Sequence, residues 1–200
     1  MNTYYKILNE IASVFNMDQW DEQVNVFTNV IEEQLDCFIY NVYESTKSPI
    51  DEEDSFHLCY SGWKELPLYQ NKFFVNGEKT VLSDYGYIKN IYQNLEYIKV
   101  TIEDIKLLLD CKWMFKDCWG LISVPMFDTS NVYTMSYMFF RCYSLQHVPA
   151  LPINNLKIAP HSMFAGCQRL TEETKQIWWL RWKNSWPRDS ALHPNKIKAE

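Results

Sequence analysis

Glycine is scarce in this chain, with 5 residues among 200. Such a low glycine content argues against a glycine-rich nucleotide-binding architecture, and an aromatic content of 16% argues against disorder. No P-loop, dinucleotide fingerprint, G-x-S-x-G elbow or H-E-x-x-H motif occurs in the sequence. The usual sequence evidence for an enzyme is missing, so we expect a protein without catalytic residues, a cofactor or a small-molecule substrate.

Paired cysteines of the C-x-x-C kind are also missing. The six cysteines are Cys37, Cys59, Cys111, Cys118, Cys142 and Cys167. Zinc sites are normally assembled from such close pairs, so we expect no metal site. A cysteine nucleophile would need a base within reach and a third group that orients the base. His57 near Cys59 and His147 after Cys142 do not make up such a set.

Export and membrane signals are not found either. The first fifteen residues lack the basic and apolar segments of a secretory signal, and their apolar positions predict an amphipathic helix. No later stretch is apolar for long enough to cross a bilayer. We therefore expect a cytoplasmic protein of a bacterial host, with free thiols and without a membrane partner.

Acidic residues are concentrated in the first 85 positions, where 15 Asp and Glu stand against 5 Lys and Arg. In the rest of the chain, 10 acidic residues stand against 14 basic ones. A compact negative surface can dock on a basic protein that would otherwise hold phosphates, although ordinary solvated surface is the alternative. The candidate contacts lie on a predicted amphipathic helix over 18–44 and in an acidic loop over 48–55: Glu32, Glu33, Asp36, Asp51, Glu52, Glu53 and Asp54.

A repeated pattern, M-F-x-x-C-x-x-L, is the strongest signal in the second half of the chain. It begins at Met114, Met138 and Met163, which are 24 and 25 residues apart. A weaker unit is predicted to precede these three, from Tyr87 onwards. A period of this length is typical of leucine-rich repeats, in which a short strand and a helical return form one coil. In stacked coils the repeated side chains fill a continuous core, and the predicted core residues are Met114, Cys118, Leu121, Met138, Cys142, Leu145, Met163, Cys167 and Leu170.

The stretch FDTSNVYTMSYMFFRCYSL, residues 127–145, resembles the BspA-type leucine-rich repeat of bacterial surface proteins. That family's pattern is roughly F-D-T-S-x-V-x-N-M-S-x-M-F-x-x-C-x-x-L, and Thr134 replaces its usual Asn. The resemblance is partial over the rest of 111–170 and absent over 1–85. It implies a repeat used for adhesion or protein binding, and it brings no catalytic residues.

Two local signals frame the repeats. KFFVNGEKTVL, residues 72–82, predicts a hairpin that turns at Asn76-Gly77. TEETKQIWWLRWKNSWP, residues 171–187, predicts a helix with Thr171 as its N-cap and with Trp178, Trp182 and Trp186 in one stripe. We expect this stripe to cover the open end of the repeats. The alternative is RNA binding, because basic and aromatic residues alternate here; the candidates are Lys175, Arg181, Lys183 and Arg188.

The predicted fold class is α+β, with an N-terminal helical region and hairpin, then a short leucine-rich-repeat-like solenoid closed by a Trp-rich helix. The expected boundaries are 1–85 for the acidic domain, 86–170 for the solenoid, 171–187 for the capping helix and 188–200 for a tail. Outward side chains of a repeat are common partner contacts, or they pack between coils. The candidates on this repeat face are Tyr133, Tyr137, Tyr143, Gln146 and His147.

From these observations we predict a non-enzymatic protein-binding module whose partner is a basic nucleic-acid-binding protein or complex. The small size, the adhesin-like repeat and the acidic first half suggest a phage or mobile-element inhibitor of a host nucleic-acid-handling defence complex, in the manner of anti-CRISPR proteins. Two alternatives stay open at this point. One is a fragment of a bacterial surface adhesion protein, and the other is an RNA-binding module that uses the C-terminal helix.

Overall fold

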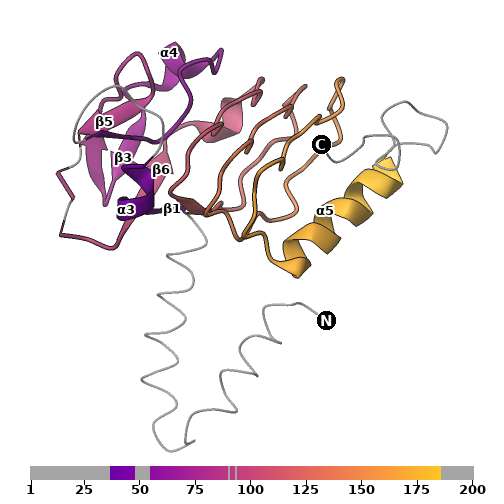
Figure 1. Ribbon diagram of the computed structural model, residues 1–200. Coiled ribbons are helices and arrows are strands. Elements are labelled where there is room, and N and C mark those ends of the chain that lie inside the picture. The colour runs from indigo at the N-terminus through magenta and orange to yellow at the C-terminus, as the bar shows by residue number, and fades with distance from the viewer. Residues whose placement is uncertain (1–36, 48–54, 90, 93, 186–200) are drawn as a thin grey trace, which may run out of the picture. The chain divides into compact units, whose positions relative to one another are not determined.

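Antiparallel β-structure links segments that lie far apart in the sequence (Figure 1). The five-stranded sheet has the order β4 (Glu78–Thr80), β3 (Phe73–Val75), β6 (Tyr97–Ile102), β1 (Phe38–Asn41) and β7 (Leu121–Ser123). A second sheet pairs β2 (Ser55–His57) with β5 (Tyr87–Lys89). The helices of the described residues are α3 (Val42–Ser45), α4 (Leu66–Tyr69) and α5 (Glu172–Ser185), with a 3-10 turn η2 (Ile105–Leu107).

The computed structural model describes residues 37–47, 55–89, 91–92 and 94–185. All of them belong to one of the two compact units of the chain, residues 36–200. The other unit, residues 1–35, lies outside the described residues, as do most of the predicted helix over 18–44 and the acidic loop.

The central strand of the five-stranded sheet is β6, whose side chains alternate between the two faces. Ile98, Val100 and Ile102 are buried, while the intervening residues are exposed. Val100 lies opposite Phe38 of β1 on one side and Val75 of β3 on the other. A strict period of two places every second side chain on one face, so this short segment supplies apolar contacts across the middle of the sheet.

A two-residue turn joins β3 to β4. Asn76 and Gly77 have φ values of 51° and 85°, both in the left-handed region. A hairpin closed by two such residues matches the right-handed twist of its strands, which explains the Asn-Gly sequence. The hairpin thus lies within the expected segment, 72–82.

The predicted fold class is wrong. Antiparallel strands dominate the described residues, which contain three helices, and the expected helical region followed by a solenoid is not what they form. Residues 38–41, predicted to end a long helix, form β1 because β6 and β7 pair with them on both sides. The expected leading repeat unit is also wrong, since Tyr87 belongs to β5 and Ile98 to β6. Strands on both sides of residue 85 therefore share one sheet.

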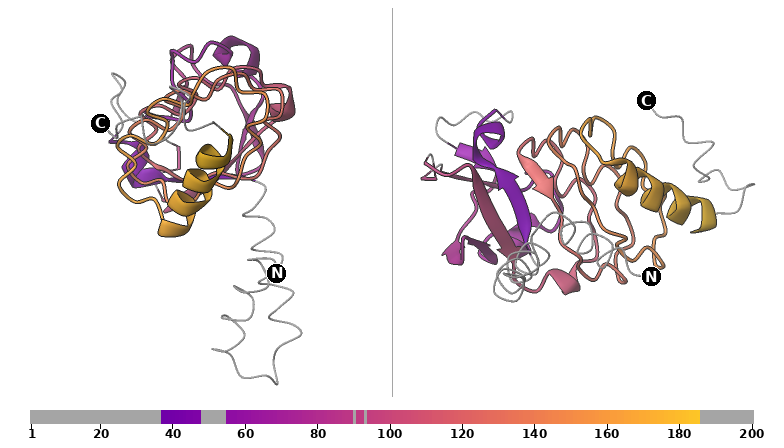
Figure 2. Two further views of the ribbon diagram at one scale, coloured as in Figure 1. Left: turned by 90° about the vertical axis from the view of Figure 1, so that its right-hand side faces the viewer. Right: turned by 90° about the horizontal axis from the view of Figure 1, so that it is seen from below.

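The M-F-x-x-C segments form hydrogen-bonded turns where helical returns were expected. We call the segments 113–121, 137–145 and 162–170 the turn stack, because they lie one behind another (Figure 2). The N–H groups of Trp113, Phe115 and Asp117 donate to the carbonyls of residues 136, 138 and 140, at 2.9–3.1 Å. Tyr137, Phe139 and Arg141 donate in the same way to residues 161, 163 and 165. Each turn thus satisfies backbone groups of the turn before it.

Repeated side chains lie on their counterparts inside the turn stack. The rings of Phe115 and Phe139 are 5.7 Å apart and nearly parallel, and Phe164 follows at 5.6 Å. The thiols of Cys142 and Cys167 each donate to a carbonyl of the preceding turn, Phe115 O and Phe139 O, at 2.9 Å. The structure buries all nine residues expected in the core.

The two ends of the turn stack are covered differently. At the first turn, Phe38 of β1 packs on Phe115 with ring centroids 5.0 Å apart, and Tyr60 N–H donates to Met114 O at 2.9 Å. At the last turn lies α5, whose buried Trp178 meets Phe164 edge-on at 5.5 Å and donates from Nε1 to Val148 O. The side chain of Thr171 accepts from Thr174 N–H, as expected of an N-cap.

Candidate binding surface

Left-handed backbone recurs at two equivalent positions of each turn in the stack. The first position holds Trp113, Tyr137 and Ser162, with φ between 48° and 66°. The second holds Asp117, Arg141 and Gly166, with φ between 60° and 84°. A non-glycine residue in this conformation costs about 1–2 kcal/mol, so five of the six positions carry local strain. At these bends Arg141 is exposed and Trp113 and Tyr137 are half-buried, whereas Asp117 is buried.

Aromatic rings and cations gather on the outward side of the first two turns. Lys112 lies over the Trp113 ring at 4.1 Å, Lys116 over the Tyr60 ring at 3.9 Å, and Arg141 over the Phe140 ring at 5.0 Å. Tyr60 meets Trp113 edge-on at 6.4 Å, and Tyr137 meets Phe140 at 5.7 Å. We call this surface the ring–cation strip; its members are Tyr60, Lys112, Trp113, Lys116, Tyr137, Phe140 and Arg141.

Charge is unevenly compensated along the strip. Lys116 Nζ forms an ion pair with Asp117 Oδ2 at 2.8 Å. Burial on its own would lower the pKa of Lys116, but hydrogen bonds with Asp117 and Tyr60 raise it, so this ammonium stays charged. Among the described residues, neither Lys112 nor Arg141 forms an ion pair. Two positive charges are therefore open to a ligand.

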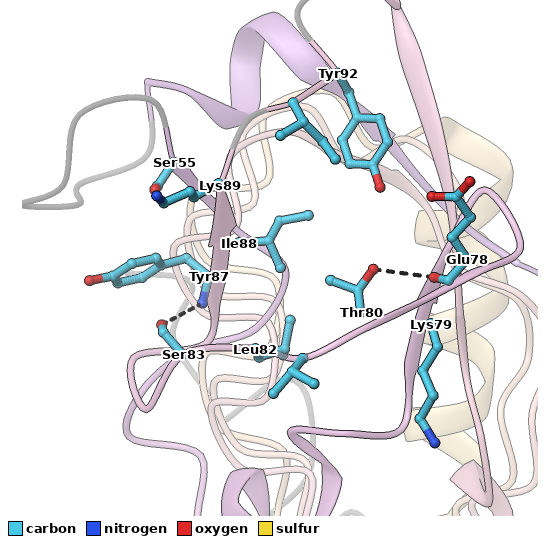
Figure 3. Close-up of a pocket in the computed structure, with 12 residues that line it drawn as sticks. Ser55, Glu78, Lys79, Thr80, Leu82, Ser83, Tyr87, Ile88, Lys89 and Tyr92 are labelled. Carbon is cyan, nitrogen blue, oxygen red and sulfur yellow. Dashed lines mark hydrogen bonds between the residues drawn. The ribbon is translucent and has the colours of Figure 1, made fainter.

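A pocket of about 570 Å³ lies beside the hairpin, between β4 and β5 (Figure 3). Ile88 and Tyr92 face Thr80 across it, and Leu82 lines its lower side. Burial, together with the nearby Glu78 carboxylate, raises the pKa of Tyr92. The lining mixes apolar side chains with Glu78, Lys79 and Lys89, and it provides space for a ligand.

Three of the four residues in the cysteine and histidine pairs considered from the sequence are buried. Cys59 is fully buried, and burial raises the pKa of its thiol, so the protonated form dominates near neutral pH. Burial lowers the pKa of His57 to about 4. In the second pair, Cys142 is buried within the turn stack while His147 is exposed.

The predicted repeat-face residues have different surroundings. Tyr137 belongs to the ring–cation strip, whereas the Tyr133 hydroxyl donates to Asp110 Oδ2, which raises the pKa of Tyr133 to about 12. Tyr143 packs edge-on against Trp119 at 5.0 Å. The carbonyl of Gln146 accepts hydrogen bonds from the start of α5, and His147 is exposed. The structure thus brings one of the five to the strip.

The charged candidates are less informative. All seven acidic candidates and Arg188 lie outside the described residues, and the side chains of Arg181 and Lys183 are not described. Lys175 lies on α5 and forms an exposed ion pair with Glu172 at 2.6 Å.

Sequence reasoning missed most of the strip. A partial signal was available in the first two repeats. Trp113 and Tyr137 precede the Met-Phe pair at aligned positions, and Lys116 and Phe140 follow it at aligned positions. Nothing local indicated that Tyr60 would lie beside Lys116, since tertiary contact alone places it there.

Comparison of the chain with protein-family models, curated proteins and solved structures gave no significant match. The likeness of residues 127–145 to the BspA-type repeat stays a resemblance of sequence. In the described part of the chain, no helix is both long and apolar enough to cross a bilayer. The same residues contain no group of three or more His, Cys, Asp or Glu that could hold a metal ion.

Proposed function

We propose that this protein is a non-enzymatic protein-binding module and that the ring–cation strip is its contact surface. The observation that carries the proposal is the strained placement of Trp113, Tyr137 and Arg141 on the outside of the turns. Trp, Tyr and Arg are the residue types most enriched at the energetic centres of protein interfaces. Here they project from a backbone held by hydrogen bonds on both sides, so little conformational freedom is left to lose on binding.

The third turn provides an internal comparison for the strain argument. Gly166 stands where Arg141 and Asp117 stand in the other turns, and it adopts the same left-handed conformation without a Cβ penalty. The turn therefore needs no side chain at this position. A sequence that keeps Arg141 there accepts a cost in stability, which supports a role for the guanidinium outside the fold.

The finer prediction concerns a basic nucleic-acid-binding partner and an inhibitory, anti-CRISPR-like role. It depends on acidic residues outside the described part of the chain, so it stays a prediction. The strip itself is positively charged, and it suggests that a second kind of contact accompanies any acidic docking surface.

The proposal can be tested without knowing the host. A random peptide-display library is panned against the folded chain, and the selected peptides are measured against Trp113→Asn and Arg141→Asn. Asparagine tolerates the left-handed region, so these variants should keep the fold. Tyr43→Asn is the matched control, because Lys47 lies over the exposed Tyr43 ring at 3.9 Å, outside the strip.

We expect the selected peptides to bind the control as they bind the wild type and to lose at least about tenfold in affinity for the strip variants, the usual size of a hot-spot loss. Circular dichroism and thermal unfolding check that the folds agree. Peptides that bind the strip variants with undiminished affinity would show that this surface is not the contact.

A further inference from the structure

We infer that the strip recognises an acidic segment of a partner protein, with carboxylates that meet Lys112 and Arg141. This inference rests on the proposed function and names the chemistry of its ligand. The two cations are open for ion pairing, as the described residues place no carboxylate within ion-pair distance of either one.

Aromatic rings hold both cations in place before a ligand binds. Lys112 rests over Trp113 at 4.1 Å and Arg141 over Phe140 at 5.0 Å. A cation that an aromatic face already holds loses less side-chain freedom when a carboxylate arrives. The planar guanidinium of Arg141 can also present two N–H groups to one carboxylate. In each ring–cation pair the cation is thus already positioned to bind an acidic side chain.

Asp117 sets a limit on how the ligand can lie. Its carboxylate is buried, is paired with Lys116, and has one oxygen, Oδ1, without a hydrogen-bond partner among the described residues. This negative charge lies beside the strip, because the backbone N–H of Asp117 donates to the carbonyl of Phe140, the residue before Arg141. A ligand with separate carboxylates can place them on Lys112 and Arg141 and avoid Asp117.

The same features disfavour single-stranded nucleic acid. Bases bind such surfaces by stacking on free aromatic faces, but a cation covers one face of Tyr60, Trp113 and Phe140. A phosphate backbone gains affinity from each phosphate that it pairs with a cation, and the strip offers two open cations for this, since Lys116 is paired with Asp117.

The experiment uses three fluorescein-labelled probes with the full chain: an oligo-glutamate, an oligo-glutamine and an oligothymidylate. Each has about ten units, enough to span turns spaced about 4.8 Å apart. Fluorescence anisotropy gives the dissociation constants at low and at physiological salt. We expect the oligo-glutamate to bind more tightly than both other probes, with an affinity that falls as salt rises.

Two sets of substitutions are expected to change the binding affinity in opposite directions. Lys112→Gln combined with Arg141→Gln should weaken oligo-glutamate binding about tenfold, since two charge-assisted contacts are lost. Asp117→Asn keeps the side-chain shape and suits the left-handed backbone. It should tighten binding a few-fold, because Lys116 then lacks its compensating charge. Lys47→Gln, outside the strip, should change nothing.

Several outcomes would overturn the inference. Tighter binding of the oligothymidylate would indicate a nucleic-acid surface, and equal binding of the two peptides would remove the role of charge. Weaker peptide binding in Asp117→Asn would contradict the assigned electrostatics. If library peptides that depend on Trp113 are uncharged, the protein-binding function stands and the acidic ligand is refuted; if none depends on the strip, the function itself is refuted.

Discussion

The five-stranded sheet and the turn stack bury their apolar side chains in different ways. In the sheet, β1 joins β6 and β7, so segments about 60 to 80 positions apart in the chain meet directly. In the turn stack, the hydrogen bonds that join one turn to the next link positions about one repeat apart, and the rings of Phe115, Phe139 and Phe164 lie on one another. The sheet alternates unlike residues across two faces, whereas the stack repeats like residues along one direction.

This difference shows where sequence variation is tolerated. An inward residue of a turn is constrained by the turns on both sides, which require the same size and shape. The outward positions before the Met-Phe pairs differ from turn to turn. Trp113, Tyr137 and Ser162 are three different residue types that share one backbone conformation. The turn stack therefore separates a uniform interior from a variable surface, and this surface is where a partner can be recognised.

The largest expected effect comes from the middle ring of the stack. Phe139→Ala should lower the free energy of unfolding by about 3–5 kcal/mol, since it removes a fully buried ring between Phe115 and Phe164. Chemical denaturation measures the loss. The adjacent outward ring is the control, and Phe140→Ala should cost about 1 kcal/mol. Similar losses in the two variants would contradict the division into interior and surface.

Gly120 tests the junction between the two regions, where Asn41 N–H of β1 donates to Gly120 O at 2.8 Å. A Cβ at this glycine would lie 2.5 Å from Asn41 O and 2.7 Å from Ser45 N. Gly120→Ala should therefore cost about 3 kcal/mol, because backbone atoms must move apart. Gly77→Ala, in the open hairpin turn with φ 85°, should cost about 1 kcal/mol. A well-tolerated alanine at Gly120 would mean that the sheet and the stack are not closely joined.

His57 makes the contact between the two-stranded sheet and the turn stack sensitive to pH. It lies in β2 beside Tyr87, and Asp117 and Lys116 of the turn stack act on it electrostatically. Burial lowers its pKa from 6.5 to about 4, so between these values the unfolded chain binds a proton that the folded chain does not. We therefore expect the contribution of His57 to the free energy of unfolding to be constant above pH 6.5 and to fall by roughly 3 kcal/mol as the pH drops toward 4.

Denaturant unfolding at a series of pH values measures this slope. His57→Phe keeps a ring beside Tyr87 and cannot take up a proton, so the difference between its curve and that of the wild type isolates His57 from the carboxyl groups. Parallel curves over pH 4–6.5 would show that His57 is already hydrated in the folded state.

The smallest predicted effect is a gain in stability, whereas the preceding ones are losses. Arg141→Gly should raise the free energy of unfolding by about 1 kcal/mol, since glycine adopts the left-handed conformation that Gly166 has in the next turn. Thermal unfolding measures the gain, and peptide binding at the strip should fall in the same variant. A destabilised Arg141→Gly would show that the fold itself needs the guanidinium, and the argument from strain would then fail.

Local signals in the sequence were sufficient for some of these elements. Asn76-Gly77 predicts its turn because both positions need left-handed backbone. Thr171 and the two acidic residues after it predict the start of α5. The spacing of Met114, Met138 and Met163 identifies the residues that share one interior. Each of these signals depends on a few neighbouring residues or on a simple period, so no tertiary information is needed.

The sequences of other elements fitted more than one structure, and the choice depended on which strands they pair with in the folded chain. The sequence YIKVTI of β6 alternates as a strand should, but the repeat interpretation placed Ile98 in a coil. Phe38 and Ile39 fit a helical period, yet they form β1 between two partners that no local pattern reveals. Short apolar segments suit either structure, and the available partner strands make the choice.

By itself the sequence determined which residues repeat, where the hairpin turns and where the last helix begins, because these depend on period, on backbone preference and on capping. Tertiary structure alone decided that residues 38–41 become the strand between β6 and β7, and that Tyr60 lies beneath the ammonium of Lys116. It also decided that Arg141 rests on Phe140 with its charge open. These contacts join segments with no shared pattern, and burial and electrostatics hold them only after the chain has folded.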